Sequence, residues 1–468
     1  MTQFVIFILV FEQVMTILRQ TFSLSRVSFE TTIEPMERTL IKDAAKKVGE
    51  KVRISGSVHV VRSHGKIVFA DIYDRTGILQ VVGGQDISEL KPQYAVEVEG
   101  TINLRPEKMI NEKIETGKIE LALKKLKILA ESEEMPFDMG AEDLNLELPT
   151  LLDFRSLTLR HPKQKEIFKV QANVARAFRE AAEELGCIEV FTPTISASAT
   201  EGGAEVFKVD YYGHDAFLVQ SPQLYKQIAV GAFERVYLFS HAYRSEPSVT
   251  TRHLSEVVQM DCEVSFIEKF EDLLDALEFV GVEMIKKAAK YSNLPLPLIS
   301  KRVPRLKLRE AQEIISKETG EKRRYDPDLT PEDEKIICEW AVREHKSDFV
   351  TITHFPTRKR AFYTMPDPSD PEFSLSYDML FRGIEIASGS QRVNNYEMLL
   401  GRMEEKGVSE KGFEIYLMAF KYGLPPEGGF SYGLERVTMK LLDLKNVREA
   451  SLFPRDMERV DLRFSSQK

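Results

Sequence analysis

Cysteine is scarce in this sequence, with three residues among 468. Cys187, Cys262 and Cys338 are scattered and show none of the short spacings of metal-binding cysteines. This scarcity argues against a disulfide framework and against a metal site built on sulfur, because both need paired or clustered cysteines. We therefore expect a protein of the reducing cytoplasm.

The sequence also lacks an excess of positive charge. Its 64 Lys and Arg residues are outnumbered by 73 Asp and Glu residues, and the formal net charge is −9. Net charge would therefore repel a nucleic acid, so such a partner must be met by a local basic patch.

No apolar run is long enough for a membrane span. The best candidate, residues 4–11, is too short to cross a bilayer and is followed by Glu12. No basic region or small-residue cleavage site flanks it. We expect residues 1–35 to be a disordered N-terminal extension or the product of a misassigned start, with Met36 as the true beginning. A membrane anchor is the minor alternative.

The remaining composition is that of a soluble globular protein, with 43% apolar and 29% charged residues, and the length allows two or three domains. Five short β-rich runs between residues 51 and 129 alternate with turn residues and predict a small OB-type barrel, although a generic β-domain has the same spacing. An acidic segment follows, and then a helical periodicity that ends at Gly186. The expected parts are an extension (1–35), a barrel (36–130), a linker (131–155) and a larger domain (156–468).

The strongest polar pattern is "YLFSHAYRSEPSVTTRHLSEVVQMDCEVSF", in which two β-patterned runs flank a polar loop. Because side chains alternate along a strand, Arg244 and Glu246 are expected on one face of the first strand of a hairpin. On the second strand, polar Gln259, Asp261 and Glu263 share the face opposite Val258, Met260, Cys262 and Val264. A solvated face is the usual explanation of alternation, but this mixture of charges favours a ligand-binding floor.

Two stretches before this hairpin also carry polar groups. In "SPQLYKQ", Ser221 suits an N-cap, and Gln223 then shares a helix face with Lys226 and Gln227. An ammonium beside amides is able to hold a carboxylate, although from this stretch alone a surface lysine is the simpler interpretation. In "TEGGAEVF", two glycines beside Glu201 fit either a mobile lid or a plain turn.

Two further stretches lie near the C-terminus. "SYDMLFRGIEIASGSQR" holds Asp378, Glu385, Ser388 and Arg392. Strict alternation separates Glu385 from Ser388 and Arg392, so their cooperation requires a bulge or a strand end at residues 388–390. "GGFSYGLERVTMKLL" runs from a predicted glycine-rich turn into a helix and places Arg436 in the first turn, where phosphate binding is favoured. That signal is weak alone and gains weight from Arg244.

Taken in order, these motifs resemble class II aspartyl-tRNA synthetases of the archaeal type over residues 38–456. "FTPTI" resembles motif 1, "YRSE" with "TTRH" motif 2, and "GLER" motif 3, while "QSPQLYKQ" is typical of the aspartate branch. The resemblance implies an α+β fold, with an OB-fold anticodon-binding barrel joined to a class II catalytic domain whose antiparallel sheet is flanked by helices. It also implies a homodimer formed through motif 1.

The implied reaction has two steps. The α-carboxylate of L-aspartate attacks the α-phosphate of ATP, and the aspartyl group then passes to the 3′-terminal adenosine of tRNA(Asp). Because little acid–base chemistry is needed, positioning and charge stabilisation should dominate.

The resemblance assigns roles to individual residues at the ATP and Mg²⁺ sites. Arg244 corresponds to the ligand of the α-phosphate, Glu246 to the adenine contact, and Arg436 to the γ-phosphate ligand. His253, with Arg252 beside it, corresponds to the contact with the outer phosphates. The Mg²⁺ ligands correspond to Asp378, Glu385 and Ser388, whose hard oxygens suit that ion.

The resemblance also outlines the aspartate pocket. Lys226 and Arg392 are expected to hold the side-chain carboxylate of aspartate. The residues expected around its other groups are Glu201, Ser221, Gln223, Asp261 and Ser388. Ser431 stands where relatives usually have glycine, and its bulk would tighten the ATP pocket.

In the barrel, Phe69 and Gln80 match the pair that stacks on and hydrogen-bonds the central anticodon uridine, and Arg62 matches a neighbouring contact. Without the resemblance, Phe69 would be taken for a core residue. His59 stands where enzymes that accept only tRNA(Asp) usually carry tryptophan, whereas relatives that charge two tRNAs often carry histidine. We therefore expect tRNA(Asn) as a second substrate and an amidotransferase as a partner. The alternative is that His59 is a plain surface residue and that the loop "RPEKMINEK" discriminates.

Three other functions remain as alternatives. An asparagine synthetase-like paralogue would keep the catalytic domain without reading tRNA, which the barrel residues Phe69 and Gln80 argue against. A non-catalytic tRNA-binding protein would not need Arg244, Glu385 and Arg436 together. An asparaginyl-tRNA synthetase is the closest enzymatic rival, but such enzymes generally lack the lysine of "LYKQ".

Overall fold

The computed structural model describes residues 36–199, 205–247, 250–323 and 325–466, which form two compact units divided between Leu144 and Asn145. The expected N-terminal extension (1–35) and Glu201 lie outside the described residues. The expected linker, residues 131–155, spans the boundary, and its second half contains helix α3 (Leu148–Asp153).

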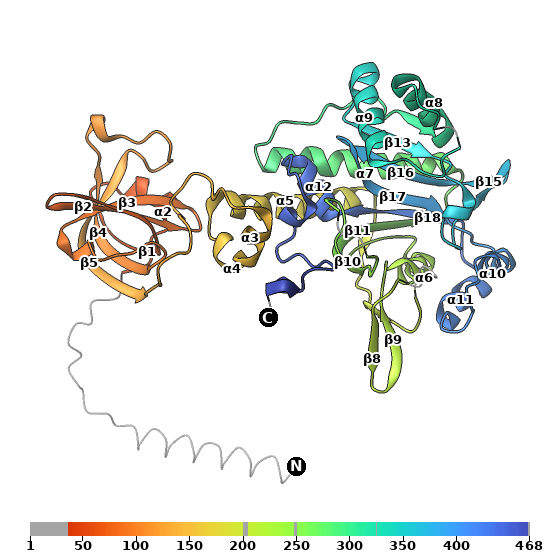
Figure 1. Ribbon diagram of the computed structural model, residues 1–468, viewed down its shortest axis with the longest axis horizontal. Coiled ribbons are helices and arrows are strands. Elements are labelled where there is room, and N and C mark those ends of the chain that lie inside the picture. The colour runs from red at the N-terminus through yellow and green to blue at the C-terminus, as the bar shows by residue number, and fades with distance from the viewer. Residues whose placement is uncertain (1–35, 200–204, 248–249, 324, 467–468) are drawn as a thin grey trace, which may run out of the picture. The chain divides into compact units, whose positions relative to one another are not determined.

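The first unit is a closed five-stranded barrel with the strand order β1-β2-β3-β5-β4 (Figure 1). Its elements are α2 (Ile41–Ala44), η1 (Ala45–Lys47), β1 (Lys51–His64), β2 (Ile67–Asp74), β3 (Gly77–Gly83), η2 (Gln85–Ile87), β4 (Ala95–Leu104), η3 (Glu107–Met109) and β5 (Ile119–Ala130). Alternate apolar residues fill the barrel, as on β1, where Val52, Ile54 and Val58 are at most 1% exposed. The residues between them therefore point outward.

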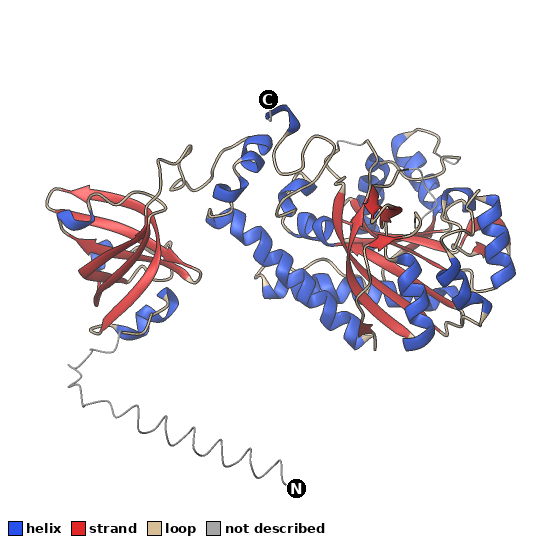
Figure 2. Ribbon diagram, turned by 90° about the horizontal axis from the view of Figure 1, so that it is seen from below, coloured by secondary structure: helices blue, strands red, loops and turns tan. Residues whose placement is uncertain are grey.

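The second unit is built on an eight-stranded sheet with the order β12-β13-β16-β17-β18-β11-β10-β6 (Figure 2). Neighbours are antiparallel, except for the parallel pairs β12–β13 and β10–β6 at the two edges. The strands are β6 (Ile188–Glu189), β10 (Arg235–Tyr243), β11 (Glu256–Ser265), β12 (Arg305–Lys307), β13 (Phe349–Thr353), β16 (Ser376–Phe381), β17 (Ile384–Gln391) and β18 (Glu427–Gly433).

Helices cover the apolar face of this sheet. α5 (Pro162–Glu184), α7 (Phe270–Tyr291) and α12 (Leu434–Leu441) share one hydrophobic core with β10, β11, β17 and β18. α5 has the predicted helical periodicity, and the chain leaves it through Gly186, whose φ of +85° is readily adopted by glycine.

The remaining elements lie around the sheet. The other helices are α4 (Arg155–Thr158), α6 (Gln223–Phe233), α8 (Leu308–Thr319), α9 (Pro331–His345), α10 (Tyr396–Glu405) and α11 (Glu414–Lys421), with 3₁₀ turns η4 (Thr357–Lys359), η5 (Val447–Ala450) and η6 (Phe464–Ser466). Two small sheets contain β7 (Ile195–Ser196), β8 (Lys208–Tyr211) and β9 (His214–Leu218), and β14 (Pro366–Asp367) with β15 (Asp370–Ser374).

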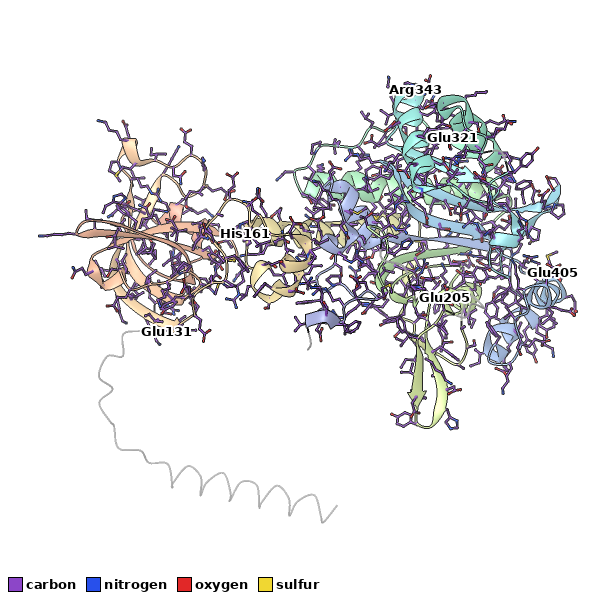
Figure 3. All side chains as sticks on the ribbon, in the orientation of Figure 1. Glu131, His161, Glu205, Glu321, Arg343 and Glu405 are labelled. Carbon is purple, nitrogen blue, oxygen red and sulfur yellow. The ribbon has the colours of Figure 1, made fainter. Side chains whose placement is uncertain are left out.

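Charged side chains on the outer helices extend into solvent, as Arg343 on α9 and Glu405 on α10 show (Figure 3). None of the helices described by the structure has the length and apolar content needed to cross a bilayer. The predicted combination of a five-stranded barrel with an antiparallel sheet flanked by helices is confirmed.

Candidate active site

A row of four polar residues crosses the middle of the large sheet. Asp261 on β11 pairs with Ser431 on β18, Ser431 pairs with Ser388 on β17, and Ser388 pairs with Asp378 on β16. Residues directly opposite each other on neighbouring strands point to the same face, so all four face away from the helices of the core. The row continues the polar face predicted for β11, whose other side, with Met260 and Cys262, lies in the core.

The strand β18 corrects one prediction. Residues 427–433 form a central strand of the sheet, not the expected glycine-rich turn. Gly429 makes a close approach possible there, because a Cβ at this position would lie 2.1 Å from Glu263 Oε2 and 2.2 Å from the carbonyl oxygen of Cys262. Arg436 does lie in the first turn of α12, as predicted.

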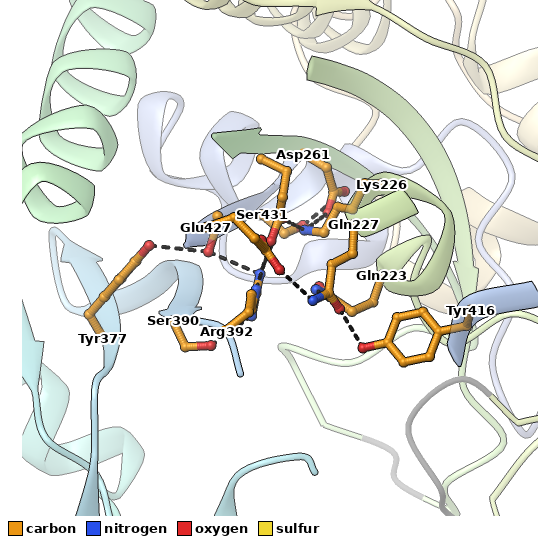
Figure 4. Close-up of polar contacts among 12 residues, drawn as sticks. Gln223, Lys226, Gln227, Asp261, Tyr377, Ser390, Arg392, Tyr416, Glu427 and Ser431 are labelled. Carbon is orange, nitrogen blue, oxygen red and sulfur yellow. Dashed lines mark hydrogen bonds and ion pairs between the residues drawn. The ribbon is translucent and has the colours of Figure 1, made fainter. Parts of the chain in front are cut away.

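Lys226 is one of the most deeply buried residues of the protein, with 1% of its surface exposed. Its Nζ lies 2.8 Å from Asp261 Oδ1 (Figure 4). The same Nζ lies 3.0 Å from Glu263 Oε2. The interpretation of Lys226 as a surface lysine is therefore wrong. Burial alone would lower the pKa of this ammonium, but the two carboxylates outweigh it and raise the pKa.

The start of α6 also differs from the prediction. Pro222 is the N-cap, the helix begins at Gln223, and no side chain caps it. Ser221 was predicted as the cap and is instead a buried residue just before the helix. The predicted shared face of Gln223 and Gln227 is confirmed, because Gln223 Nε2 donates to Gln227 Oε1 at 2.9 Å.

Arg392 follows the last residue of β17 and binds the same carboxylate as Lys226. Its Nε and Nη2 donate to the two oxygens of Glu263 at 2.7 and 3.3 Å, and Nη2 also donates to the carbonyl oxygen of Gly429 at 3.1 Å. Nη1 donates to Ser390 Oγ at 2.7 Å. Burial would raise the pKa of Glu263, but Arg392 and Lys226 outweigh it and lower this pKa to about 2.

A fully buried carboxyl group, that of Glu427, lies next to this cluster. Gln227 Oε1 accepts hydrogen bonds from Gln223 and from the hydroxyl of Tyr416, so its amide Nε2 is directed to Glu427 Oε1, at 2.6 Å. Burial and the hydrogen-bonded Glu263 carboxylate raise the pKa of Glu427 well above its usual range. The protonated form of Glu427 is therefore favoured, because a neutral carboxylic acid avoids a second buried charge beside Glu263.

With Asp261 and Glu263 ionised and Glu427 protonated, the charges of the cluster are balanced before any substrate binds. Lys226 and Arg392 face two carboxylates, those of Asp261 and Glu263. The contacts above use two of three N–H groups of the lysine and four of five of the arginine, so among the described residues each keeps one donor. The floor thus offers two hydrogen-bond donors within a neutral cluster.

A cavity of about 140 Å³ opens beside the polar row. It is lined by Arg244, Arg252, His253, Leu254, Val257, Gln259, Glu385, Ile386, Ser388, Ser431, Gly433, Glu435, Arg436 and Val447. Burial and then the nearby Arg436, Arg244 and Arg252 lower the pKa of His253, which shows that three guanidinium groups converge on this imidazole. The three guanidinium groups that line this cavity suit a polyphosphate.

Arg244 and Glu246 are not on the strand where they were predicted. β10 ends at Tyr243, and both residues lie in the following segment, although Arg244 N still donates to the carbonyl of Ser255 at 2.9 Å. The Arg244 guanidinium makes no ion pair with any residue that the structure describes. Glu246 lines a separate neighbouring cavity with Tyr243 and Glu256.

The predicted bulge of β17 exists but lies earlier in the chain. The register with β16 shifts at Ile386, between Glu385 and Ala387, and not at residues 388–390. This extra residue brings Glu385 to the face of Ser388, while Arg392 lies beyond the end of the strand.

The two carboxylate oxygens of Asp378 differ in their hydrogen bonding. Its Oδ2 accepts from Arg360 Nη2 at 2.7 Å, whereas its Oδ1 is buried and has no hydrogen-bond partner among the described residues. Burial raises the pKa of Asp378 to about 6, Arg360 opposes this shift and Glu385 adds to it. Two carboxylates thus lie together, and no group of three or more potential His, Cys, Asp or Glu metal ligands gathers in the described part of the chain.

The predicted anticodon residues lie together on the outside of the barrel. Arg62 pairs with Phe69 across β1 and β2, and Gln80 on β3 pairs with Asp71 on β2. Arg62 binds Asp71 through two hydrogen bonds of 2.8 and 2.9 Å, and Gln80 Nε2 donates to Glu120 at 3.1 Å. Phe69 is half-buried, so it is not a core residue.

His59 occupies a bulge in β1. The register with β2 shifts between Val58 and Val60, which leaves His59 as the extra residue. Its ring meets Tyr73 edge-on at 6.2 Å and lines an outer cavity of the barrel together with Ser63 and Lys91. The bulge re-aims this side chain outward.

Several residues of the site were not found from the sequence. Glu427 was detectable, because it alternates with Gly429 and Ser431 and would have been placed on the polar face had the segment been recognised as a strand. Arg360 and Glu334 reach the site from a loop and from α9, and no local pattern marks either of them.

Comparisons with known proteins support the same division of the chain. The family of OB-fold nucleic acid binding domains matches residues 52–129, and the family of class II tRNA synthetases (D, K and N) matches residues 147–457. The chain is 38% identical over 431 residues to the aspartate–tRNA(Asp/Asn) ligase of Thermus thermophilus, covering 90% of this chain and 99% of the relative.

Two further proteins are also similar to this chain. The aspartate–tRNA(Asp) ligase of Pyrococcus furiosus is 37% identical over 430 residues, covering 88% of this chain and 96% of the relative. The crystal structure of asparaginyl-tRNA synthetase from Pyrococcus horikoshii with asparaginyl-adenylate has a TM-score of 0.81 and 29% identity, covering 91% of this chain and 100% of that structure.

The buried Glu427 generates a test of stability. A glutamine has the same donor and acceptor as a neutral carboxylic acid, so Glu427→Gln should preserve the network. In the wild type, Glu427 must take up a proton when the chain folds at any pH above the ordinary glutamate pKa of 4.5. The stability supplied by the protonated group is complete below that pH and is lost, by up to about 1.4 kcal/mol per pH unit, as the pH rises towards the folded pKa.

Urea unfolding at pH 5, 6, 7 and 8 measures this difference. The advantage of Glu427→Gln over the wild type should grow with pH, and the exposed Glu404→Gln is the matched control. An advantage that stays constant with pH would show that Glu427 is ionised in the folded protein.

Proposed function

The chain belongs to the class II tRNA synthetases of the aspartate, lysine and asparagine group, on the aspartyl branch, and from this premise we propose how its residues aspartylate tRNA. It is an aminoacyl-tRNA synthetase that uses ATP to join aspartate to tRNA. The residue assignments rest on one observation. Two buried cations, Lys226 and Arg392, form the floor of the site beside a cavity lined by three arginines.

We assign the aspartate side chain to the floor of the site. Its carboxylate takes the remaining N–H of Lys226 and of Arg392, and its ammonium lies near Asp261, Ser221 and Gln223. This arrangement leaves the α-carboxylate directed to the cavity beside the polar row.

ATP is assigned to that cavity. Its α-phosphate lies against Arg244, whose guanidinium makes no other ion pair with a described residue, and its outer phosphates lie between Arg252, His253 and Arg436. We keep Glu246 as the adenine contact, which requires the segment after β10 to move from the neighbouring cavity when the nucleotide binds.

A magnesium ion fits this arrangement. Asp378 offers a buried oxygen that has no hydrogen-bond partner among the described residues, Glu385 a second carboxylate and Ser388 a hydroxyl. Mg²⁺ is commonly held by one or two carboxylates together with substrate phosphates, which matches two carboxylates rather than a complete protein cage. When bound, the ion would neutralise phosphate charge.

The chemical steps then need little proton transfer from the protein. An oxygen of the aspartate α-carboxylate forms a bond to the α-phosphorus, the bond to the leaving pyrophosphate breaks, and Arg244 neutralises the charge that gathers on the α-phosphate oxygens. The 3′-terminal adenosine of the tRNA then attacks the acyl carbon through a hydroxyl, and AMP leaves. Fixed positions and fixed charges supply the rate enhancement.

We propose tRNA(Asn) as a second substrate beside tRNA(Asp). The central base would stack on Phe69 and hydrogen-bond Gln80, with Arg62 beside them. His59, in its bulge, presents a small ring at the outer cavity and leaves room for either neighbouring base. The relatives named above include one ligase of each specificity, and a partner amidotransferase would convert Asp-tRNA(Asn) to Asn-tRNA(Asn).

A homodimer through motif 1 is also proposed. The chain after α5 exposes large apolar side chains, with Ile188 51%, Phe191 88% and Ile195 43% exposed. Apolar groups so placed are suited to cover one another in a symmetric pair.

The phosphate assignment is tested by Arg244→Ala and Arg436→Ala in aspartate-dependent ATP–pyrophosphate exchange. Each variant should lose kcat by roughly 10²-fold or more, because each removes a charge directed at a phosphate. Arg343→Ala, an exposed arginine on α9, is the control and should exchange as the wild type does. An active variant at either position would refute the role of that residue.

Amino-acid selection is tested by comparing aspartate with asparagine in the same exchange reaction. The two free donors on Lys226 and Arg392 accept no hydrogen bond, so the NH₂ group of asparagine would face a cation. Asparagine should therefore exchange far more slowly than aspartate, because it leaves a buried donor unpaired. Comparable exchange with asparagine would refute the assignment of Lys226 and Arg392 to the aspartate side chain and would favour the asparaginyl-tRNA synthetase alternative.

The choice of tRNA is tested by charging tRNA(Asp) and tRNA(Asn) transcripts with the wild type and with His59→Trp. The wild type should charge both, and the variant should favour tRNA(Asp), because the larger ring fills the space beside the barrel. A shift of ~1–3 kcal/mol is typical for one base contact. A wild type that ignores tRNA(Asn) would refute the broader specificity.

A further inference from the structure

One carboxylate outside the sequence motifs links the parts of the phosphate cavity. Glu334 lies in the first turn of α9, and its side chain is 10% exposed. Both of its oxygens accept from the guanidinium of Arg252: Nη1 donates to Oε1 at 3.3 Å, and Nη2 forms a shorter bond to Oε2. Arg252 Nη2 also donates to the carbonyl oxygen of Gly383 at 3.4 Å.

The same carboxylate holds the backbone of β17. Oε2 of Glu334 accepts the N–H of Glu385 at 2.9 Å. The carbonyl oxygen of Glu385 accepts from Arg436 Nη1 at 3.0 Å, and this Nη1 lies 3.3 Å from Glu385 Oε2. Glu334 is thus connected to both arginines assigned to the outer phosphates.

The helix that carries Glu334 does not need its side chain. Thr330 caps α9 by accepting from the N–H of Asp333 at 3.2 Å, and Asp333 Oδ2 accepts from the N–H of Thr330 at 2.9 Å. Glu334 is therefore a buried acid whose hydrogen bonds all lead to the cavity and none to the end of its helix.

We propose that Glu334 is the positioning residue of the phosphate-binding side of the site. It holds the Arg252 guanidinium in a two-point contact and keeps it from pairing with the nearby Glu385, whose carboxylate is assigned to the metal ion. A long side chain fixed in advance loses less freedom when the phosphate binds, which lowers the cost of binding. The inference rests on the proposed function, because it takes the outer phosphates of ATP to lie between Arg252 and Arg436.

The test is a double-mutant cycle in aspartate-dependent ATP–pyrophosphate exchange, with KM measured separately for ATP and for aspartate. Glu334→Gln keeps one acceptor for the Glu385 N–H but loses the charge and the two-point contact with Arg252. We expect KM for ATP to rise about tenfold, a common effect of a residue that orients a ligand-binding group, and KM for aspartate to stay within twofold.

The second arm repeats the change in an Arg252→Ala background. There Glu334→Gln should have little further effect on KM for ATP, because the group it positions is gone. Glu334→Asp should recover part of the loss. Glu332→Gln, an exposed glutamate of the same helical turn that pairs with Lys335, is the matched control and should resemble the wild type.

The outcomes distinguish a failure of the positioning role from a failure of the proposed function. Unchanged KM for ATP in Glu334→Gln, or effects of the two changes that simply multiply, would overturn the positioning role. A fall in thermal stability with equal losses for both substrates would also overturn it, since it would show a structural role. A wild type without aspartate-dependent exchange would instead refute the proposed function itself.

Discussion

The organisation of the catalytic unit depends on the cost of burying charge. Lys226, Asp261, Glu263 and Arg392 are withdrawn from water almost completely, and removal of any one would leave an uncompensated ion in the interior. The surrounding structure meets this requirement in detail. Gly429 leaves space for Glu263, Ser390 takes an arginine donor, and the chain from Gln223 through Gln227 reaches the neutral Glu427.

The two halves of the site handle positive charge in opposite ways. On the side that we assign to aspartate, both cations are paired with buried carboxylates, so we expect selection to depend on where their remaining donors point. On the side that we assign to phosphate, Arg244 makes no ion pair with a described residue, whereas Arg252 pairs with Glu334 and Arg436 contacts the carbonyl oxygen and the carboxylate of Glu385. An excess of positive charge there suits a ligand with several negative charges, whereas the same excess around a small zwitterion would bind anions indiscriminately.

Much of the fold and part of the site were predictable from local patterns. The alternation of Val52 and Ile54 on β1 and the polar face of β11 follow from the two-residue period of a strand, and Arg436 follows from helix periodicity. The burial of Lys226 was not predictable, because its two carboxylate partners lie on a strand 35 and 37 positions away. β18 was mistaken for a turn because it is rich in glycine. Here Gly429 allows close packing against Glu263, and the sequence alone does not distinguish a glycine needed for packing from a glycine needed for a turn. The bulge at Ile386 was placed too late for a similar reason, since its position is set by pairing with β16.

The row formed by Asp261, Ser431, Ser388 and Asp378 has a consequence for how the chain reaches its native state. These residues belong to four strands, and each strand carries apolar side chains on its other face. If one strand slipped by a single position during folding, its polar residue would turn towards the helices and its apolar neighbour towards water. Every such misregistered sheet would bury a hydroxyl or a carboxylate without partners and would therefore be less stable than the native sheet. The residues assigned to the reaction thus also favour the correct alignment of the strands.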